Sequence, residues 1–218
     1  MVTSLRTAHC TEHGHKELTL QLVDKPVPGS ETWLVAYLER AVASGSKFLP
    51  GQTIQLGWST LRVIERGDGT LGLEERVDLE TWRESVTLAL WHTWTQKEVA
   101  ASFGLVDELQ FPQQEQDAMV ARCALETDTL LLTRISVDEP SFSGWGVTCA
   151  QDHEHGERGF VPLLEVTARL PFLAQFVALP AGTSVLVIGP GRIRAHAFRD
   201  GAPLAIEPGS YVAALNEA

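Results

Sequence analysis

Alternating apolar positions predict strands in the first part of the chain. In residues 17–23, leucines occupy every second position, a pattern typical of a strand with one buried face. Residues 53–58 alternate in the same way through Ile54, Leu56 and Trp58, and Leu61 and Val63 continue this predicted strand. The turn sequence Gly67-Asp-Gly-Thr70 then precedes a third alternating segment at 71–73, which favours a tight hairpin.

Apolar residues at helical spacing predict two helices in the same half. The first would be capped by Ser30 and would end at Gly45. Its apolar face would be formed by Trp33, Leu34, Tyr37, Leu38, Ala41 and Val42. A second helix is predicted over 80–104, with Val86, Leu90 and Trp94 on one side, and we expect it to join the two halves of the chain.

The second half shows a similar mixture of strands and helix. A polar stretch at 112–117 indicates a linker or a short turn, so a domain boundary is expected near residue 110. We expect paired strands at 118–125 and 129–135, a strand at 145–149, a polar loop at 151–159, a helix opened by Pro162, and a final hairpin through 184–188 and 192–198.

These patterns predict an α+β protein made of two modules. Residues 1–110 would form the first and residues 111–218 the second, each a mainly antiparallel sheet packed against helices. The chain of 218 residues, with 44% hydrophobic and 21% charged residues, has the composition of a folded protein. The longest apolar runs are too short for a membrane span and no secretory signal is visible, so a cytoplasmic location is expected, without membrane partners.

The charge of the chain lies mostly in one segment. The net charge is −11, and the segment 107–157 contains eleven carboxylates against Arg122 and Arg134, a net charge of −9. This balance opposes binding to the phosphate backbone of nucleic acids and favours basic partners, or simply a well-solvated surface.

Two histidine-rich segments are the main candidates for chemistry. The first contains His9, Cys10, His13 and His15, and the second runs from Asp152 to His155. Imidazole and thiolate are good zinc ligands, but the spacing fits an ordinary polar turn in both places. Cys10, Cys123 and Cys149 are an odd number of cysteines at long spacing, which fits reduced thiols better than disulfides. We therefore predict no metal and no cofactor, and leave metal binding by the histidines as an alternative.

Other catalytic motifs are missing from the sequence. No GxSxG nucleophile motif occurs, and the glycines at 189 and 191 lie between strand-like segments rather than before a helix. The sequence therefore predicts no catalytic residue. A small metal-dependent enzyme or metal sensor using His13, His15, His153 and His155 is kept as an alternative function.

Tryptophan is abundant, and one tryptophan differs from the rest. Five of the six lie in the first 94 residues, and most of these five are expected in the core: Trp33, Trp58, Trp82, Trp91 and Trp94. Trp145 lies between two glycines and shortly after Asp138 and Glu139. An exposed or half-exposed tryptophan beside charge would anchor a protein interface.

The second half of the chain resembles a known family over about residues 118–190. The resemblance rests on a strand pair ending in Arg134, the acidic loop, the sequence Ser143-Gly-Trp145, Leu163, Leu170-Pro171, and the run Leu179-Pro-Ala-Gly182. This series is similar to small immunity proteins of bacterial polymorphic toxin systems. Phe142 and Gly146 depart from the family pattern, where an aspartate and a bulky basic residue are usual. More weakly, residues 14–51 resemble an uncharacterised bacterial α+β module.

The resemblance implies a non-enzymatic antidote that binds a cognate toxin domain, such as an effector of a type VI secretion system. A nuclease toxin carries a basic cleft, which the acidic segment could occupy. The expected toxin-binding residues are Asp138, Glu139, Ser143, Trp145, Asp152, Glu154 and Glu157. A generic interaction module is a further alternative, and the oligomeric state stays open.

Overall fold

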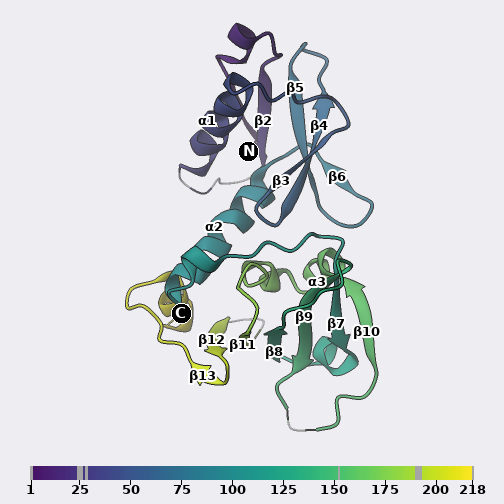
Figure 1. Ribbon diagram of the computed structural model, residues 1–218, viewed down its shortest axis with the longest axis vertical. Helices are drawn as coiled ribbons and strands as arrows, with labels where there is room; N and C mark the ends of the chain where they lie inside the picture. The colour runs from purple at the N-terminus through teal and green to yellow at the C-terminus, as the bar shows by residue number, and fades with distance from the viewer. Residues whose placement is uncertain (1, 24–26, 28, 152, 190–192, 218) are drawn as a thin grey trace. The chain divides into compact units, whose positions relative to one another are not determined.

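The computed structural model describes residues 2–23, 27, 29–151, 153–189 and 193–217. The chain forms two compact units, Met1–Trp94 and Thr95–Ala218 (Figure 1). Each unit contains one mainly antiparallel sheet together with helices, so the predicted α+β class with two sheet modules is confirmed.

Unit 1 is built on a six-stranded sheet. Its strands lie in the order β1-β2-β5-β4-β3, with β6 paired to β5. Only the contact between β2 and β5 is parallel among the described strand pairs of this sheet. The elements are β1 (Val2–Arg6), β2 (Leu18–Val23), α1 (Ser30–Ala43), β3 (Thr53–Leu56), β4 (Ser59–Glu65), β5 (Leu71–Arg76) and β6 (Trp82–Arg83), with a 3₁₀ turn at Cys10–His13.

The core of unit 1 lies between this sheet and α1. Leu20 on β2 and Leu38 on α1 are almost completely buried, as the period-two and helical patterns predicted. Each such side chain contributes about 1.5–3 kcal/mol of hydrophobic stabilisation. The helix presents a narrower apolar face than expected, because Trp33 is 44% exposed and stacks on the half-exposed Tyr37. Trp91 is also exposed, so the expectation of a core position is wrong for Trp33 and Trp91.

A buried carboxylate ties the N-terminal turn of unit 1 to β2. Glu17 accepts hydrogen bonds from Thr7 Oγ1 at 2.5 Å, from Thr11 N at 2.9 Å and from Thr11 Oγ1 at 3.0 Å. Burial by itself would raise the pKa of Glu17, but these hydrogen bonds outweigh it and lower the pKa to about 2. The carboxylate is therefore a structural feature of the turn that contains the first histidine cluster.

Helix α2 (Thr87–Ser102) contains the boundary between the units. It begins later than the predicted 80–104, because Trp82 and Arg83 form β6 and the side chain of Ser85 accepts a hydrogen bond from Thr87 N. The boundary lies before residue 110 because the end of α2 bonds to unit 2. Gln96 donates to the carbonyl of Ala174 at 2.8 Å, and Ser102 Oγ accepts from Val212 N.

Unit 2 is built on a seven-stranded sheet in the order β10-β7-β9-β8-β11-β12-β13. The strands are β7 (Asp117–Ala121), β8 (Thr129–Arg134), β9 (Phe142–Cys149), β10 (Arg158–Pro162), β11 (Thr183–Ile188), β12 (Arg194–Arg199) and β13 (Ala202–Pro203). The predicted pairing of the strands near 118–125 and 129–135 is wrong. β9 lies between β7 and β8 and pairs with β7 in parallel and with β8 antiparallel.

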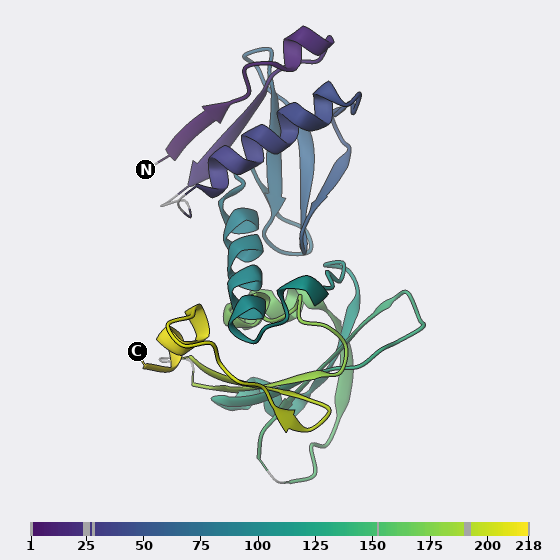
Figure 2. The ribbon, with the colours of Figure 1, turned by 60° about the vertical axis from the view of Figure 1, so that its left-hand side comes forward.

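Helix α3 (Leu163–Arg169) and the 3₁₀ turn Pro171–Gln175 pack on one face of this sheet (Figure 2). The other helical elements of unit 2 are α4 (Tyr211–Glu217) and 3₁₀ turns at Val106–Glu108 and Arg122–Glu126. Alternate residues of β8 and β9, including Leu132 and Val147, are buried on the covered face, where they line a small apolar cavity together with Leu163 and Phe176. No helix among the described residues is long and apolar enough to cross a membrane.

Candidate functional site

The Ser143-Gly-Trp145 motif lies near the start of β9, in the middle of the unit 2 sheet. Ser143 is buried; its hydroxyl donates to the carbonyl of Asp117 at 2.8 Å and accepts from Trp145 N at 3.2 Å. The first bond connects β9 to the beginning of β7, and the second lies within β9. The motif serine is therefore used within the fold, where its side chain is almost completely covered.

The expectation that Trp145 is exposed is wrong. Its side chain is 4% exposed and points to the helix-covered face, and Nε1 donates to the carbonyl of Val177 at 2.9 Å. The strand alternates buried and half-buried residues, which places Ser143 and Trp145 on the same inner face. The guanidinium of Arg134 lies 5.7 Å from the centre of the Trp145 ring and shares its acceptor, Val177.

The opposite face of the same strands is open and hollow. Gly144 and Gly146 stand on this face and line the hollow. Gly144 has a φ of +79°, and a Cβ there would lie 2.2 Å from the carbonyl oxygen of Ile135, so only glycine fits. The hollow has a volume of about 310 Å³. Its lining consists of Asp117, Met119, Thr133, Ile135, Val137, Phe142, Gly144, Trp145, Gly146 and Phe160.

Exposed apolar side chains surround this hollow. Phe160 on β10 is 63% exposed, Ile135 is 59% exposed and Val137 is 39% exposed. The ring of Phe142 packs against Phe160 with centres 4.9 Å apart. A contiguous exposed apolar surface of this kind marks a site of protein or ligand binding. This surface was not predicted from the sequence, because residues 158 and 159 were expected in a polar loop and a helix was expected from Pro162, where β10 is found.

The acidic residues predicted to bind a partner are divided into two groups, one at each end of β9. Asp138 and Glu139 are exposed and follow Val137 at the rim of the hollow. Glu154 and Glu157 are exposed in the loop that follows Cys149, at the other end of β9. The length of β9 separates its two ends by about 23 Å, at about 3.3 Å per residue. Asp152 lies outside the described residues.

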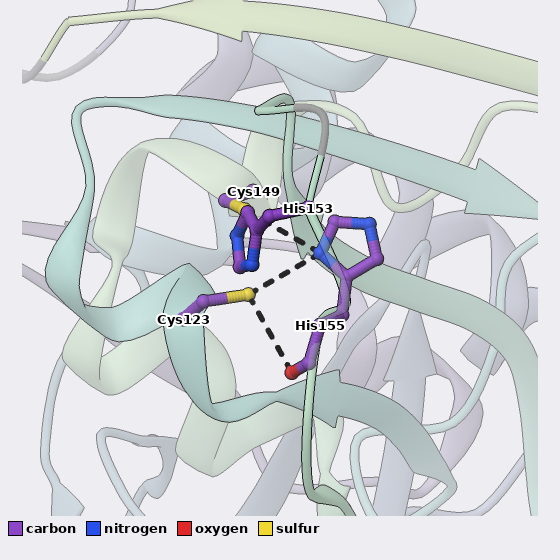
Figure 3. A group of neighbouring side chains, drawn as sticks. All are labelled: Cys123, Cys149, His153 and His155. Atoms are coloured by element: carbon purple, nitrogen blue, oxygen red, sulfur yellow. Dashed lines mark hydrogen bonds between the residues drawn. The ribbon is translucent and has the colours of Figure 1, made fainter.

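That second end of β9 contains a group of two cysteines and two histidines (Figure 3). Their ligand atoms, from Cys123, Cys149, His153 and His155, all lie within 4.8 Å of one another. Cys149 Sγ lies 2.8 Å from His153 Nε2 and 3.5 Å from His155 Nδ1, and Cys123 Sγ lies 3.4 Å from His155 Nδ1. Cysteine and histidine at such distances form the donor set of zinc sites.

The N-terminal histidines do not join such a group among the described residues. His15 uses both ring nitrogens within unit 1: Nδ1 lies 2.6 Å from the carbonyl of Lys16, and Nε2 accepts from Phe48 N at 2.9 Å. His9 Nδ1 lies 3.0 Å from a carboxylate oxygen of Glu12. The structure therefore does not bring His13 and His15 together with His153 and His155. Among the described residues, His153 and His155 lie instead beside Cys123 and Cys149.

Comparison with known proteins adds one finding. Residues 95–195 match the model of the Imm33-like domain, a family of the immunity-protein type. The match covers most of unit 2 and includes the hollow, the buried motif and the Cys/His group. The match supports the resemblance to an immunity-protein family. It does not assign a role to the Ser143-Gly-Trp145 motif. Neither the curated proteins nor the solved structures contain a match to this chain.

Proposed function

We propose that this protein is an immunity protein whose unit 2 binds and neutralises a cognate toxin domain through the open face of its sheet. The match of residues 95–195 to the Imm33-like domain carries the proposal, because immunity proteins act by binding a toxin. The protein then acts as a stoichiometric inhibitor and not as an enzyme.

The hollow supplies the contact surface in this proposal. Phe160, Ile135 and Val137 together offer exposed apolar area around a concave centre, which suits an apolar side chain of the partner. Trp145 and Arg134 support this surface from the covered face and hold the strands that display it. Trp145 therefore acts on binding through the fold, and the anchors at the interface are the residues on the open face.

The acidic residues determine which toxin surface is preferred. Asp138 and Glu139 stand at the rim of the hollow, where rim charges steer encounter with a basic surface. A nuclease toxin has such a surface, since it must bind phosphates. We therefore propose a nuclease-type effector as the partner, with Glu154 and Glu157 as a second acidic group at the far end of the strands.

The first experiment is co-expression of the protein with toxin-like domains sought among the products of the neighbouring genes, followed by measurement of growth and of complex formation. The purified pair is then studied with Phe160→Ala at the hollow. Loss of a central aromatic anchor costs about 2 kcal/mol or more of binding free energy, which raises the dissociation constant about 30-fold. Because Phe160 is exposed, the variant should keep the stability of unit 2.

Phe111→Ala is the matched control, since Phe111 is also exposed in unit 2 but does not line the hollow. A double change, Asp138→Lys with Glu139→Lys, should slow association and weaken its dependence on salt, whereas the same changes at Glu154 and Glu157 should have a smaller effect. Equal loss of affinity in the Phe111 and Phe160 variants, or growth rescue without a complex, would contradict the proposed surface.

A further inference from the structure

The end of the unit 2 sheet opposite the hollow holds a group of side chains that the proposed function does not use. Three segments meet there. Cys123 belongs to the 3₁₀ turn Arg122–Glu126 after β7, Cys149 is the last residue of β9, and His153 and His155 lie in the loop that leads to β10. Figure 3 shows the four side chains directed toward one another.

We propose that Cys123, Cys149, His153 and His155 form a structural zinc site that holds the loop between β9 and β10. Two thiolates and two imidazoles are a common donor set of structural zinc sites. Four protein ligands complete a tetrahedron and leave no position for a reacting water, so the site stabilises the fold and does not catalyse.

The observed distances agree with a zinc tetrahedron. With Zn–S of about 2.3 Å and Zn–N of about 2.0–2.1 Å, sulfur and nitrogen ligands lie about 3.5 Å apart. His155 Nδ1 lies 3.4 Å from Cys123 Sγ and 3.5 Å from Cys149 Sγ, close to that value. His153 Nε2, at 2.8 Å from Cys149 Sγ, would need to move outward by less than 1 Å to take its place in the tetrahedron.

The surroundings orient one ligand and leave a route for the ion. His153 Nδ1 lies 2.7 Å from the carbonyl of Glu154, so this nitrogen donates its proton there and Nε2 is free to bind metal. Cys149 is buried, Cys123 and His155 are half-buried, and His153 is exposed. A zinc ion can therefore enter from solvent on the His153 side while the sulfur ligands lie deeper.

The site would explain how this polar loop is held. The segment carries the exposed residues Glu154 and Glu157, and backbone bonds attach it at its ends, from Ala150 N to Thr129 O and from Arg122 N to Glu157 O. Zinc would join its middle to β9 and to the turn after β7. Because the site is at the other end of the strands from the hollow, zinc binding does not depend on the apolar toxin surface proposed there.

The test is made on the full chain without a histidine tag, purified under reducing conditions from zinc-containing medium. Elemental analysis should find about one zinc per chain. After removal with a chelator, added Co²⁺ should give the visible absorption of a tetrahedral ion and a thiolate-to-cobalt charge-transfer band, saturating at one equivalent. Hydrogen exchange of residues 150–157 should slow when zinc is added back.

Two ligand variants, Cys123→Ser and His153→Ala, should each weaken zinc binding at least tenfold in competition with a chelating dye. Their controls are Cys10→Ala and His196→Ala, which change the same residue types outside the group and should bind zinc as the unchanged chain does. The proposal is overturned if the reduced chain binds neither Zn²⁺ nor Co²⁺, if the Co²⁺ spectrum lacks the thiolate band, or if the ligand variants bind as tightly as the controls.

Discussion

Removal of one buried guanidinium should loosen unit 2 without affecting unit 1. Arg134 is 7% exposed, and its Nη1 donates to the carbonyls of Gln110 at 2.7 Å, Val177 at 3.1 Å and Leu179 at 2.6 Å. Burial lowers the pKa of Arg134 to about 10, so the group stays charged at neutral pH. Arg134→Met keeps a long apolar stem and removes all three bonds.

The expected loss of stability follows from the carbonyls left behind. Val177 O retains its bond from Trp145 Nε1, whereas the carbonyls of Gln110 and Leu179 lose the Arg134 donor. A buried acceptor without its donor costs about 1–3 kcal/mol, and this applies to the Leu179 carbonyl, whereas Gln110 is exposed and its carbonyl can bond to water. The variant no longer buries a charge, which offsets part of this loss, and we expect about 1–2 kcal/mol in total.

Hydrogen exchange followed by mass spectrometry is the suitable assay, because a chain of two units need not unfold in one transition. Core peptides of β8 and of residues 177–188 should exchange about 5- to 30-fold faster in the variant, which is the factor that corresponds to the expected loss of stability. Peptides of β2 and α1 in unit 1 serve as an internal control and should not change. A change below about threefold in unit 2 would refute the stabilising role assigned to these bonds.

Three further changes probe the remaining features. Trp145→Phe removes the bond to Val177, whose carbonyl keeps the Arg134 donor, and leaves a small cavity on the covered face, so unit 2 should lose about 2 kcal/mol and still bind the toxin. Loss of binding in a folded variant would indicate that Trp145 contacts the toxin directly. Gly144→Ala places a Cβ against the Ile135 carbonyl and should cost about 3 kcal/mol in thermal unfolding, whereas a neutral result would argue against the close approach. The pKa of Glu17 is lowered to about 2 from 4.5, so its stabilisation is complete above pH 4.5 and is lost as the pH falls toward 2. This loss amounts to up to about 3 kcal/mol, and Glu17→Gln should remove the corresponding pH dependence from acid unfolding of unit 1.

Local patterns predicted the elements that depend on local rules. The alternation of Leu18, Leu20 and Leu22 predicted β2, and the turn at 67–70 predicted the β4–β5 hairpin, because side-chain direction in a strand and turn geometry depend on near neighbours. The α+β class and the two modules followed from the same patterns. The resemblance of the second half to immunity proteins agrees with the match of residues 95–195 to the Imm33-like domain.

Features that depend on distant contacts were decided by the tertiary structure. Trp145 was expected on the surface because glycines and charges flank it, but the strand alternation and the Val177 carbonyl place it in the core. The placement of β9 between β7 and β8 brings the turn after β7 to the end of β9, and this puts Cys123 beside Cys149, His153 and His155. The sequence contained the four ligands, but spacing along the chain does not report proximity across a sheet. Composition and period alone determined the class of fold and most of its elements, whereas the open hollow and the Cys/His group exist only because strand order brings separate segments together.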